Sequence, residues 1–471
     1  QWSCTASGGS PLIINGNLKI DPAVKWSTGA FSGGMTIQGT ILVHGEWMGS
    51  GSGNLGTHTF VGSFAIGPGG KYQLATTGLT QGNVVFLGDV TNDGAFVTPS
   101  NRAVIFNGVH SQTISGSAGI TFNKGFTATC SIAIEAGMLV RAGGGSALVA
   151  NSDMAISGTL SGADTNTRLI LGGPGNRLIL NDATVSIGAI LVRDGRSHTI
   201  SGTGTLAGCS VVIDSSSTLM LESNLTMEKG TVDVVKGYVT VANGCTIAFS
   251  GSWRQSIPPL SYSNLTVNNP AGVLLSGPTS VNGILKVVSG TLITGVHPLT
   301  LGPEGALEEG DLQSVAGKIA TTRTLTSTAN ASFGGLGVEL NPSRSTVGPA
   351  TVIRVTGSAP AIGGGISILR YFDVSFSAAA VDATLIFHYA ASELNGVNES
   401  KLQLFRSTDG GATWSAEGGV VNTSAHTITL AGVNPFSRWA AGEVVPAPTL
   451  SGVSPSFGVW GDNLTVTITG T

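Results

Sequence analysis

The sequence predicts an all-β protein whose larger part is a β-helix or β-solenoid and whose later part is a β-sandwich. Three observations support this prediction. Glycine supplies 70 of the 471 residues, about twice its usual share. Charged residues make up only 10 % of the chain and hydrophobic residues 41 %, a balance that excludes ordinary disorder. Short β-branched segments alternate with Gly, Asn and Asp turns, and helical periodicity is almost absent.

Residues 21–305 form the predicted solenoid. A glycine followed by a Thr or β-branched residue and then by Leu, Ile or Val recurs along this region, at Gly39, Gly158, Gly204, Gly230, Gly283 and Gly290. These segments alternate apolar and polar residues, so each can bury mainly one side and needs a stacked neighbour to form a core. Parallel stacking also explains the low charge, because like charges at equivalent positions would lie about 4.8 Å apart. An antiparallel series of sandwiches remains the alternative.

The segments before and after the predicted solenoid differ from it in composition and strand pattern. Residues 1–20 are predicted to cap the open end of the stack, because a bare end invites pairing with other chains. Residues 306–347 carry an acidic cluster and are predicted to be a transition. Residues 348–443 contain longer strands with aromatic residues at the spacing of a β-sandwich. Residues 444–471 are a proline-containing linker followed by a new strand pattern.

Several segments resemble known modules. The run from Tyr262 to Ser276, with the run from Val281 to Thr294, resembles the β-strand repeats of large secreted surface proteins of the Bacteroidota, and a looser match covers 150–305. The segment from Ile368 to Gly442 is similar to a β-sandwich module that often follows those repeats. The segment from Pro448 to Gly470 looks like the start of an immunoglobulin-like IPT/TIG domain. This resemblance implies an adhesin-like surface protein that continues past Thr471 and is exported by a type IX route.

Charge and hydropathy limit the partners. The net charge is −4 and the 22 basic residues are scattered singly, so nothing favours nucleic acid as a partner. No apolar run approaches the roughly 18 residues of a membrane span, so we expect no membrane insertion. An N-terminal Gln1 without an initiator Met is consistent with a cleaved signal peptide. We therefore expect a secreted or cell-surface location.

The cysteines predict a buried ladder. Cys130, Cys209 and Cys245 each begin a similar strand segment, at spacings of 79 and 36 residues that approximate multiples of an 18- to 20-residue coil. We expect equivalent coil positions and free buried thiols, with two disulfides that include Cys4 as the alternative. No Cys-x-x-Cys spacing occurs, which argues against a metal site.

One motif has a known pattern. The segment from Ser407 to Trp414 fits the Asp-box pattern Ser-x-Asp-x-Gly-x-Thr-Trp of sialidases, where the box recurs on several propeller blades away from the catalytic residues. Asp409 is expected to bond to turn donors, Gly410 and Gly411 to adopt positive φ, and Trp414 to pack beneath the turn. A single copy favours a structural hairpin.

Catalysis on a β-helix would need carboxylates that converge from adjacent coils. The first 300 residues contain isolated acids, none of them in an Asp-x-Asp or Asp-Asp pair, such as Asp153, Asp164, Asp182, Asp194, Asp214 and Asp233. His44 and Glu46 are predicted to share a strand face beside Trp47, which is more typical of a surface contact. We predict no enzyme activity and no catalytic, cofactor-binding or metal-ligating residues.

Other candidate sites have simple structural interpretations. The segment from Asp89 to Gly94 is the best calcium-loop candidate, but a plain Asn-Asp-Gly turn is favoured. The seven tryptophans show no spacing typical of a sugar-stacking platform and are expected mainly in the core: Trp2, Trp26, Trp47, Trp253, Trp414, Trp439 and Trp460. Glycosylation is not expected at the six sequons: Asn224, Asn264, Asn330, Asn398, Asn422 and Asn463.

The sequence therefore predicts a structural or adhesive protein that forms a rigid extracellular stalk or fibre. Its expected partners are other copies of the chain, surface glycans or other cells. A carbohydrate-active enzyme, a lyase or hydrolase, or a carbohydrate-binding protein on the same scaffold is the alternative. An ice- or mineral-binding face would need a regular Thr ladder that the degenerate repeat does not provide.

Overall fold

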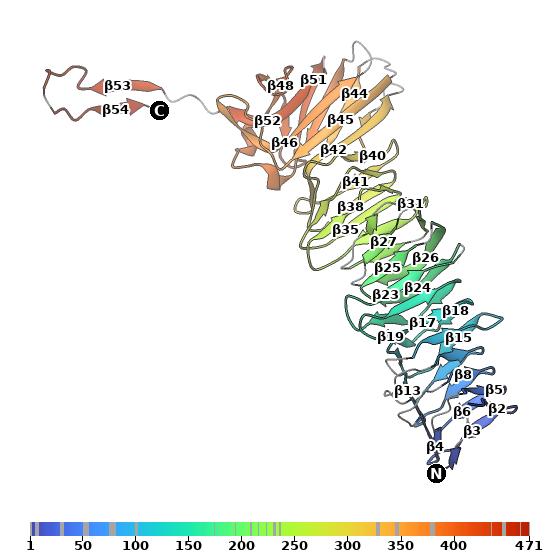
Figure 1. Cartoon of the computed structure of the whole chain (residues 1–471). Helices are drawn as coiled ribbons and strands as arrows, with labels where there is room; N and C mark the ends of the chain where they lie inside the picture. Colours follow the sequence, from blue (N-terminus) through green and yellow to red (C-terminus); the bar gives the residue numbers. More distant parts are fainter. Residues whose placement is uncertain are drawn as a thin grey trace. The chain divides into compact units, whose positions relative to one another are not determined.

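The computed structural model is nearly all β, with 56 % of residues in strands and about 1 % in helices, which confirms the predicted fold class. Contacts divide the chain into two compact units, Gln1–His297 and Pro298–Thr471 (Figure 1). The structure describes residues 2–4, 9–28, 33–49, 56–74, 82–98, 102–173, 175–193, 195–207, 210–214, 216–222, 224–228, 232–234, 237–325, 330–343, 348–376, 382–434, 436–444, 449–461 and 463–470.

The first unit is a parallel β-solenoid of about 13 turns. Most coils contribute three strands in chain order, and most strands pair in parallel with their equivalents one coil before and one coil after. We call the three resulting sheets the first, second and third face. The antiparallel alternative is wrong for this region.

The strands of the three faces have these bounds. The first face contains β2 (Leu12–Ile14), β5 (Met35–Ile37), β8 (His58–Phe60), β11 (Val84–Phe86), β14 (Val104–Phe106), β17 (Gly125–Ala128), β20 (Ala147–Ala150), β23 (Arg168–Leu171), β25 (Ala189–Val192), β27 (Ser210–Ile213) and β30 (Val232–Val234). The second face contains β3 (Leu18–Ile20), β6 (Ile41–Val43), β9 (Phe64–Ile66), β12 (Val90–Asn92), β15 (Gln112–Ser115), β18 (Ile132–Ile134), β21 (Met154–Ile156), β28 (Thr218–Leu221) and β31 (Tyr238–Val241). The third face contains β1 (Trp2–Cys4), β4 (Lys25–Thr28), β7 (Glu46–Gly49), β10 (Lys71–Gln73), β13 (Ala95–Val97), β16 (Ile120–Phe122), β19 (Leu139–Ala142), β22 (Thr159–Gly162), β29 (Leu225–Met227), β32 (Thr246–Phe249), β35 (Asn264–Asn268) and β38 (Ile284–Ser289). The long strands β24 (Arg177–Ser186) and β26 (Ser197–Leu206) serve the second and third faces in turn.

Most three-residue strands bury their first and last side chains and leave the middle one half-exposed, as in β5, β8 and β11. This alternation is the period of two that the sequence shows. The interior of the early coils is filled by aromatic columns. On the third face Trp26, Trp47, Tyr72 and Phe96 occupy equivalent positions, and consecutive ring centroids lie 4.6, 5.1 and 5.3 Å apart. Stacked equivalents therefore make one continuous core.

A buried arginine shows how a charge is accommodated inside the stack. Arg102 is fully buried at the corner before β14. Its Nε donates to the carbonyl of Gly82 at 2.6 Å, and its Nη2 donates to the carbonyl of Gly56 at 2.7 Å. An added Cβ at Gly82 would lie 2.2 Å from the Thr57 amide nitrogen, so this corner requires glycine. The guanidinium thus binds backbone carbonyls of the two preceding coils.

Coil length changes along the stack. Equivalent residues are 23 residues apart between Met35 and His58 and 26 apart between His58 and Val84. Only later coils shorten to 18, as between Thr246 and Asn264. The predicted coil of 18 to 20 residues is therefore too short for the early coils, whose corners are longer. Within 1–20, strands β2 and β3 are already rungs of the stack.

The last strands of the first unit belong to two further parallel ladders. One contains β33 (Gln255–Ile257), β36 (Val273–Leu275) and β39 (Thr291–Ile293), and the other contains β34 (Ser261–Tyr262) and β37 (Thr279–Val281).

The second unit contains two antiparallel sheets. It opens with β40 (Leu299–Leu301) and β41 (Ala306–Glu308). One sheet contains β42 (Ser314–Leu325), β45 (Gly348–Thr356), β46 (Gly365–Phe376), β52 (Arg438–Val444), β48 (Gln403–Ser407) and β49 (Ser415–Gly418). The other contains β43 (Ala331–Ser332), β44 (Val338–Pro342), β47 (Ala383–His388), β51 (Thr427–Val433) and β50 (Val420–Asn422). The remaining elements are the short helices η1 (Ala391–Glu393) and η2 (Glu399–Lys401) and a hairpin of β53 (Leu450–Ser454) with β54 (Thr467–Gly470).

The two sheets of the second unit face one another. Phe372 on β46 and Phe387 on β47 meet edge to face, with ring centroids 4.9 Å apart. Trp439 and Leu340 are fully buried, as expected between two packed sheets. This arrangement supports the predicted sandwich-like region, while the domain boundaries given above stay predictions.

Candidate functional site

The most site-like feature of the solenoid is a seam between two coils. The ladder of the third face runs on through β29, β32 and β35. Within the described residues, however, the first face ends at β30 and the second at β31, and new sheets begin at β33 and β34. The strand edge of β31 that faces the following coil is therefore left without a partner strand.

Two prolines account for the seam. Pro258 and Pro259 stand immediately before β34, where a regular rung would pair with β31. Proline has no N–H to donate to a ladder and is confined to edges. The next amide, of Leu260, donates to the carbonyl of Pro258 at 2.9 Å, and the buried Tyr262 hydroxyl donates to the same carbonyl at 3.1 Å. The chain turns on itself here and does not continue the sheet.

A groove of about 370 Å³ lies along this seam. It is lined by uncharged residues of β31 and of the coils beyond it: Val239, Thr240, Val241, Asn243, Ser261, Ser263 and Asn282. The volume is within the range of small-ligand sites. Tyr238, next to the groove on β31, has 71 % of its surface exposed.

Hydrogen bonds fix the far wall of the groove. The Ser263 hydroxyl accepts from the Gly244 amide at 2.7 Å. The Ser261 hydroxyl oxygen accepts from the Ser280 hydroxyl at 2.9 Å and from the Asn282 amide nitrogen at 3.3 Å. On the near wall, Thr240 is exposed. The groove thus offers neutral donors and acceptors but no acid or base, an arrangement suited to binding and not to proton transfer.

The second unit holds a buried charge cluster, which we call the ion-pair cluster: Glu309, Arg354, Arg370 and Glu393. Arg354 donates to both oxygens of Glu309, the second at 3.0 Å. Arg370 donates to Glu393 Oε1 from Nε at 3.1 Å and from Nη2 at 2.9 Å. Burial and the neighbouring Arg354 lower the pKa of Arg370, while Glu393 and Glu309 oppose that shift.

Backbone amides donate further hydrogen bonds to the carboxylates of the ion-pair cluster. The Val315 amide donates to Glu309 and the Ala390 amide donates to Glu393, both at 3.0 Å. The adjoining cavity is only about 150 Å³. Carboxylates already bound to guanidinium and amide donors are poor general bases, so the cluster is suited to holding β45, β46 and η1 together.

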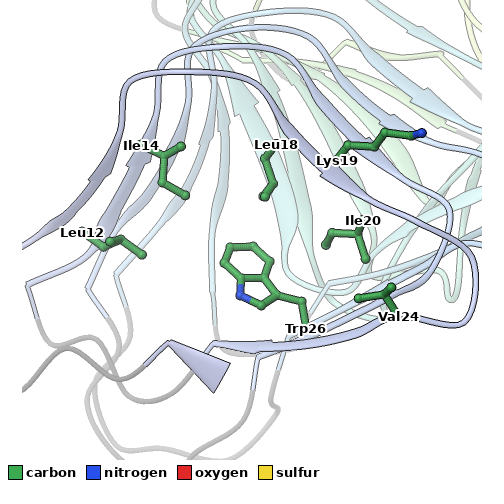
Figure 2. A pocket seen from close by; sticks show the side chains of 7 residues that line it. All are labelled: Leu12, Ile14, Leu18, Lys19, Ile20, Val24 and Trp26. Carbon is green, nitrogen blue, oxygen red and sulfur yellow. The ribbon is translucent and has the colours of Figure 1, made fainter. Parts of the chain in front are cut away.

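A third cavity lies at the N-terminal coil (Figure 2). Its volume is about 390 Å³ and its lining is mainly apolar: Leu12, Ile14, Leu18, Lys19, Ile20, Val24 and Trp26. Figure 2 shows Trp26 in the middle of these side chains, with the Lys19 side chain extending away from them. Lys19 pairs with the exposed Asp21 at 2.7 Å. The apolar residues are the first layer of the solenoid core.

The Asp-box segment is a hairpin turn between β48 and β49, as predicted. Asp409 accepts from the Ser407 hydroxyl at 2.7 Å and from the Thr413 amide at 2.9 Å. Gly410 and Gly411 have φ of +75° and +103°, and Trp414 Nε1 donates to the Gly411 carbonyl at 3.1 Å. The Thr413 hydroxyl also donates to Asp409 at 2.6 Å, and this bond, with those from the Thr413 amide and the Ser407 hydroxyl, lowers the pKa of Asp409.

The isolated acids of the solenoid act as caps. Asp153 accepts from the Arg177 amide at 2.8 Å, and Asp164 accepts from the Gly145 amide at 3.0 Å. Asp182 and Asp214 accept from side-chain hydroxyls at 2.6 and 2.8 Å. Asp194 and the side chain of Asp233 lie outside the described residues.

The calcium-loop candidate is also engaged in capping. Asp89 and Asp93 accept, at 2.8 Å, from amides of the next coil, those of Thr113 and Ser117. Asn92 is buried and donates to the carbonyl of Gly119 at 2.9 Å. Among the residues that the structure describes, no group of three or more His, Cys, Asp or Glu side chains is placed to hold a metal ion.

The predicted strand face of His44 and Glu46 does not form. His44 lies in the bend between β6 and β7, Glu46 begins β7, and Trp47 is fully buried. Glu46 pairs with Lys25 of the preceding rung at 3.0 Å. The bend interrupts the alternation of side chains between the two sides of a strand, so the two-residue spacing from His44 to Glu46 did not place them on one face.

The predicted cysteine ladder is wrong. Cys130 stands before β18 on the second face, whereas Cys245 stands before β32 on the third face, so the two are not equivalent. Neither is in a disulfide: Cys245 is buried, and the half-buried Cys130 donates to Gln112 Oε1 at 2.9 Å. Burial raises the pKa of the Cys130 thiol. Cys209 and the side chain of Cys4 lie outside the described residues.

The tryptophans separate into two groups. Trp26, Trp47 and Trp439 are in the core, as expected, and Trp414 is half-buried. Trp253 and Trp460 are exposed, which the prediction missed. The side chain of Trp2 lies outside the described residues.

Comparison of the chain with known protein families, with curated proteins and with solved structures found no match. Within the described ranges, no helix is long and apolar enough to cross a membrane. Neither the seam nor the ion-pair cluster was predicted from the sequence. The Pro258-Pro259 pair within a strand repeat was the available signal for the seam, whereas the cluster joins residues up to 84 positions apart in the chain, from Glu309 to Glu393.

Proposed function

We propose that this chain is a structural stalk of an extracellular or cell-surface protein and serves adhesion by holding other modules away from their attachment point. Secretion, adhesion and a Bacteroidota-type origin are parts of this proposal, as is the reading of residues 444–471 as the start of an IPT/TIG domain. The fold is the physical basis of the proposal, because a stack of coils extends by about 4.8 Å per turn.

One observation carries the proposal: the third face is a continuous parallel ladder from β1 to β38. The about 13 turns of the stack correspond to a shaft of about 60 Å at the usual strand spacing. Each rung is held by the rungs on either side, so length is added without a larger globular core.

The use of the acids supports a passive role. Asp153 and Asp164 cap backbone amides of neighbouring coils, and the carboxylates of the ion-pair cluster are bound by guanidinium groups. Carboxylates used in this way contribute to the scaffold and are not poised for acid and base catalysis.

A polysaccharide panel tests the choice between stalk and enzyme. The purified chain is incubated with neutral and acidic polysaccharides, and reducing and unsaturated ends are measured against a protein-free blank. We expect no release above the blank. Release that depends on protein concentration, and that the variant Asp164→Asn lacks, would replace the stalk with an enzyme. Immunogold labelling of intact producing cells tests the location, and label confined to the cell interior would contradict it.

A second candidate function is binding of a neutral glycan, and the seam groove favours it. The groove combines hydroxyl and amide groups with the exposed Tyr238, and sugars use hydrogen bonds together with aromatic stacking. Calorimetry with neutral oligosaccharides is the test. The variants Tyr238→Ala and Thr240→Val should weaken binding at least fivefold, and Thr226→Val on β29 should not. No heat with any neutral oligosaccharide would exclude this candidate.

A further inference from the structure

The first face of the solenoid differs from the other two in its outward side chains. Its outward central column, from β2 to β23, contains only β-branched residues: Ile13, Thr36, Thr59, Val85, Ile105, Thr127, Val149 and Ile170. These side chains are half-buried in the sheet surface, except Ile13, which is 56 % exposed. They form a low ridge at a regular spacing.

The flanking columns of the same face are also uncharged. Ladder hydrogen bonds extend each rung by one residue at either end, for example from the Gln38 amide to Ile14 and from the Leu12 amide to Gly34. Over the seven rungs from β2 to β20 the outward flanking residues are small, polar or aliphatic: Pro11, Asn15, Gly34, Gln38, Thr57, Val61, Asn83, Leu87, Ala103, Asn107, Gly125, Thr129, Ala147 and Asn151. We call this seven-rung surface the neutral face.

The exposed Lys124 stands at the corner before β17, and Arg102 is buried at the corner before β14. Most other charged residues of the same coils lie on or beside the other two faces. The second face carries Lys19 on β3 and Asp89 and Glu135 at strand ends. The outward side of the third face carries Lys25, Glu46, Lys71 and Arg141. A copy that approached either of these faces would have to desolvate charges, whereas the neutral face imposes no such cost.

The neutral face also has the dimensions of an interface. Seven rungs at about 4.8 Å and five residues at about 3.3 Å give about 34 by 17 Å, or roughly 570 Å² for each copy. Two copies would bury about 1,100 Å², just above the roughly 1,000 Å² that a specific interface needs and below the roughly 1,600 Å² of a standard one. The expected affinity is therefore modest.

A second copy matches the neutral face in shape. Both copies have rungs at the same spacing, so a two-fold axis through the face can set rung against rung along its whole length, at the about 10 Å separation of packed sheets. We propose that two copies of this chain pair side by side through the neutral face. This pairing deepens the proposed stalk function by naming its lateral partner.

Sedimentation velocity of the full chain, over a range of concentrations, tests the pairing. We expect a monomer–dimer equilibrium with a dissociation constant in the micromolar range. The double variant Thr59→Lys and Thr127→Lys should weaken it at least tenfold, because it places two ammonium groups of each copy in an apolar contact. The matched control Thr159→Lys with Thr226→Lys places two ammonium groups of each copy on the third face and should leave the constant unchanged.

Salt provides a second measurement. A neutral interface should hold its dissociation constant within about twofold between 50 and 500 mM NaCl, whereas an interface built on charge would weaken steeply. Circular dichroism and thermal melting confirm that each variant folds.

Two results would overturn the proposal: a wild type that stays monomeric at several hundred micromolar, or equal weakening by the control. Neither result would contradict the proposed stalk function, which the polysaccharide panel tests separately. A monomer that releases no sugar ends in that panel would still be a stalk.

Discussion

The solenoid and the C-terminal unit treat charge in opposite ways. In the solenoid, ion pairs such as Lys25 with Glu46 and Arg177 with Glu222 lie on the solvent side. The buried Arg102 donates hydrogen bonds to backbone carbonyls. In the C-terminal unit, Arg354 and Arg370 are buried against carboxylates.

Strand direction and repetition explain the contrast. Parallel stacking places each residue beside its equivalents in the adjacent coils. Like charges at equivalent positions would repel one another, so charged side chains lie mainly on the solvent side of the stack. Antiparallel strands and the loops between them bring unlike positions together, so a guanidinium can meet a carboxylate from a distant segment. A stack of repeats therefore favours uncharged residues at equivalent positions, whereas a sandwich can contain buried ion pairs.

The largest expected effect comes from breaking the ion-pair cluster. Glu309→Ala leaves the Arg354 guanidinium buried without its carboxylate, and such losses cost about 3–5 kcal/mol. Hydrogen exchange should show the loss in peptides from 348–444 and not in those from 35–190. The double variant Glu309→Ala with Arg354→Met should recover much of it. A loss below about 1 kcal/mol, or equal loss in both units, would contradict the contrast.

The next effect comes from the buried His58. Burial, and then the charge of Arg102, lower its pKa from 6.5 to about 3 in the folded protein. The unfolded state therefore binds the proton more readily, and stability falls as the pH drops from 6.5 towards 3, by about 1.4 kcal/mol per pH unit. At pH 5 this group should have reduced the free energy of unfolding by about 2 kcal/mol relative to pH 7.

The variant His58→Leu should remove that part of the pH dependence, and unfolding in urea at pH 5, 6 and 7 would measure it. His110 is exposed, so His110→Leu should keep the wild-type slope. If His58→Leu kept the same slope, the interior of the early coils would be wetter than described here.

The smallest effect concerns a single ladder bond. The hydroxyls of Thr91 and Ser115 lie 3.0 Å apart on adjacent rungs of the second face. Because both side chains keep access to water, Thr91→Val should cost only about 0.5 kcal/mol. A double-mutant cycle with Ser115→Ala isolates the pair, and a coupling above about 1.5 kcal/mol would mean that surface ladders matter more than the core does.

Local pattern was enough to predict the class of fold. Glycine followed by a β-branched residue, as at Gly39 and Gly158, indicates short strands that must stack, and the structure confirms the solenoid. The Asp-box hairpin was also predictable, because its hydrogen bonds lie within the segment from Ser407 to Trp414. Features that depend on neighbouring residues are encoded locally.

Features that depend on which residues of different coils are equivalent were not predictable. Cys130 and Cys245 share a local frame but lie on different faces, because equivalent second-face residues between them are 20 to 24 positions apart. The Gly82 corner that accepts Arg102 and the partners of Glu309 join residues that only the folded stack or sandwich brings together. Register across coils is a tertiary property, and a degenerate repeat does not fix it.

Single-molecule force spectroscopy on the chain, held at its two ends, tests the stalk most directly. If each coil is supported only by its neighbours, the solenoid should extend in a series of small steps, each about 60–90 Å for the 18 to 26 residues of one coil. A single step that releases the whole of Gln1–His297 at once would contradict the account.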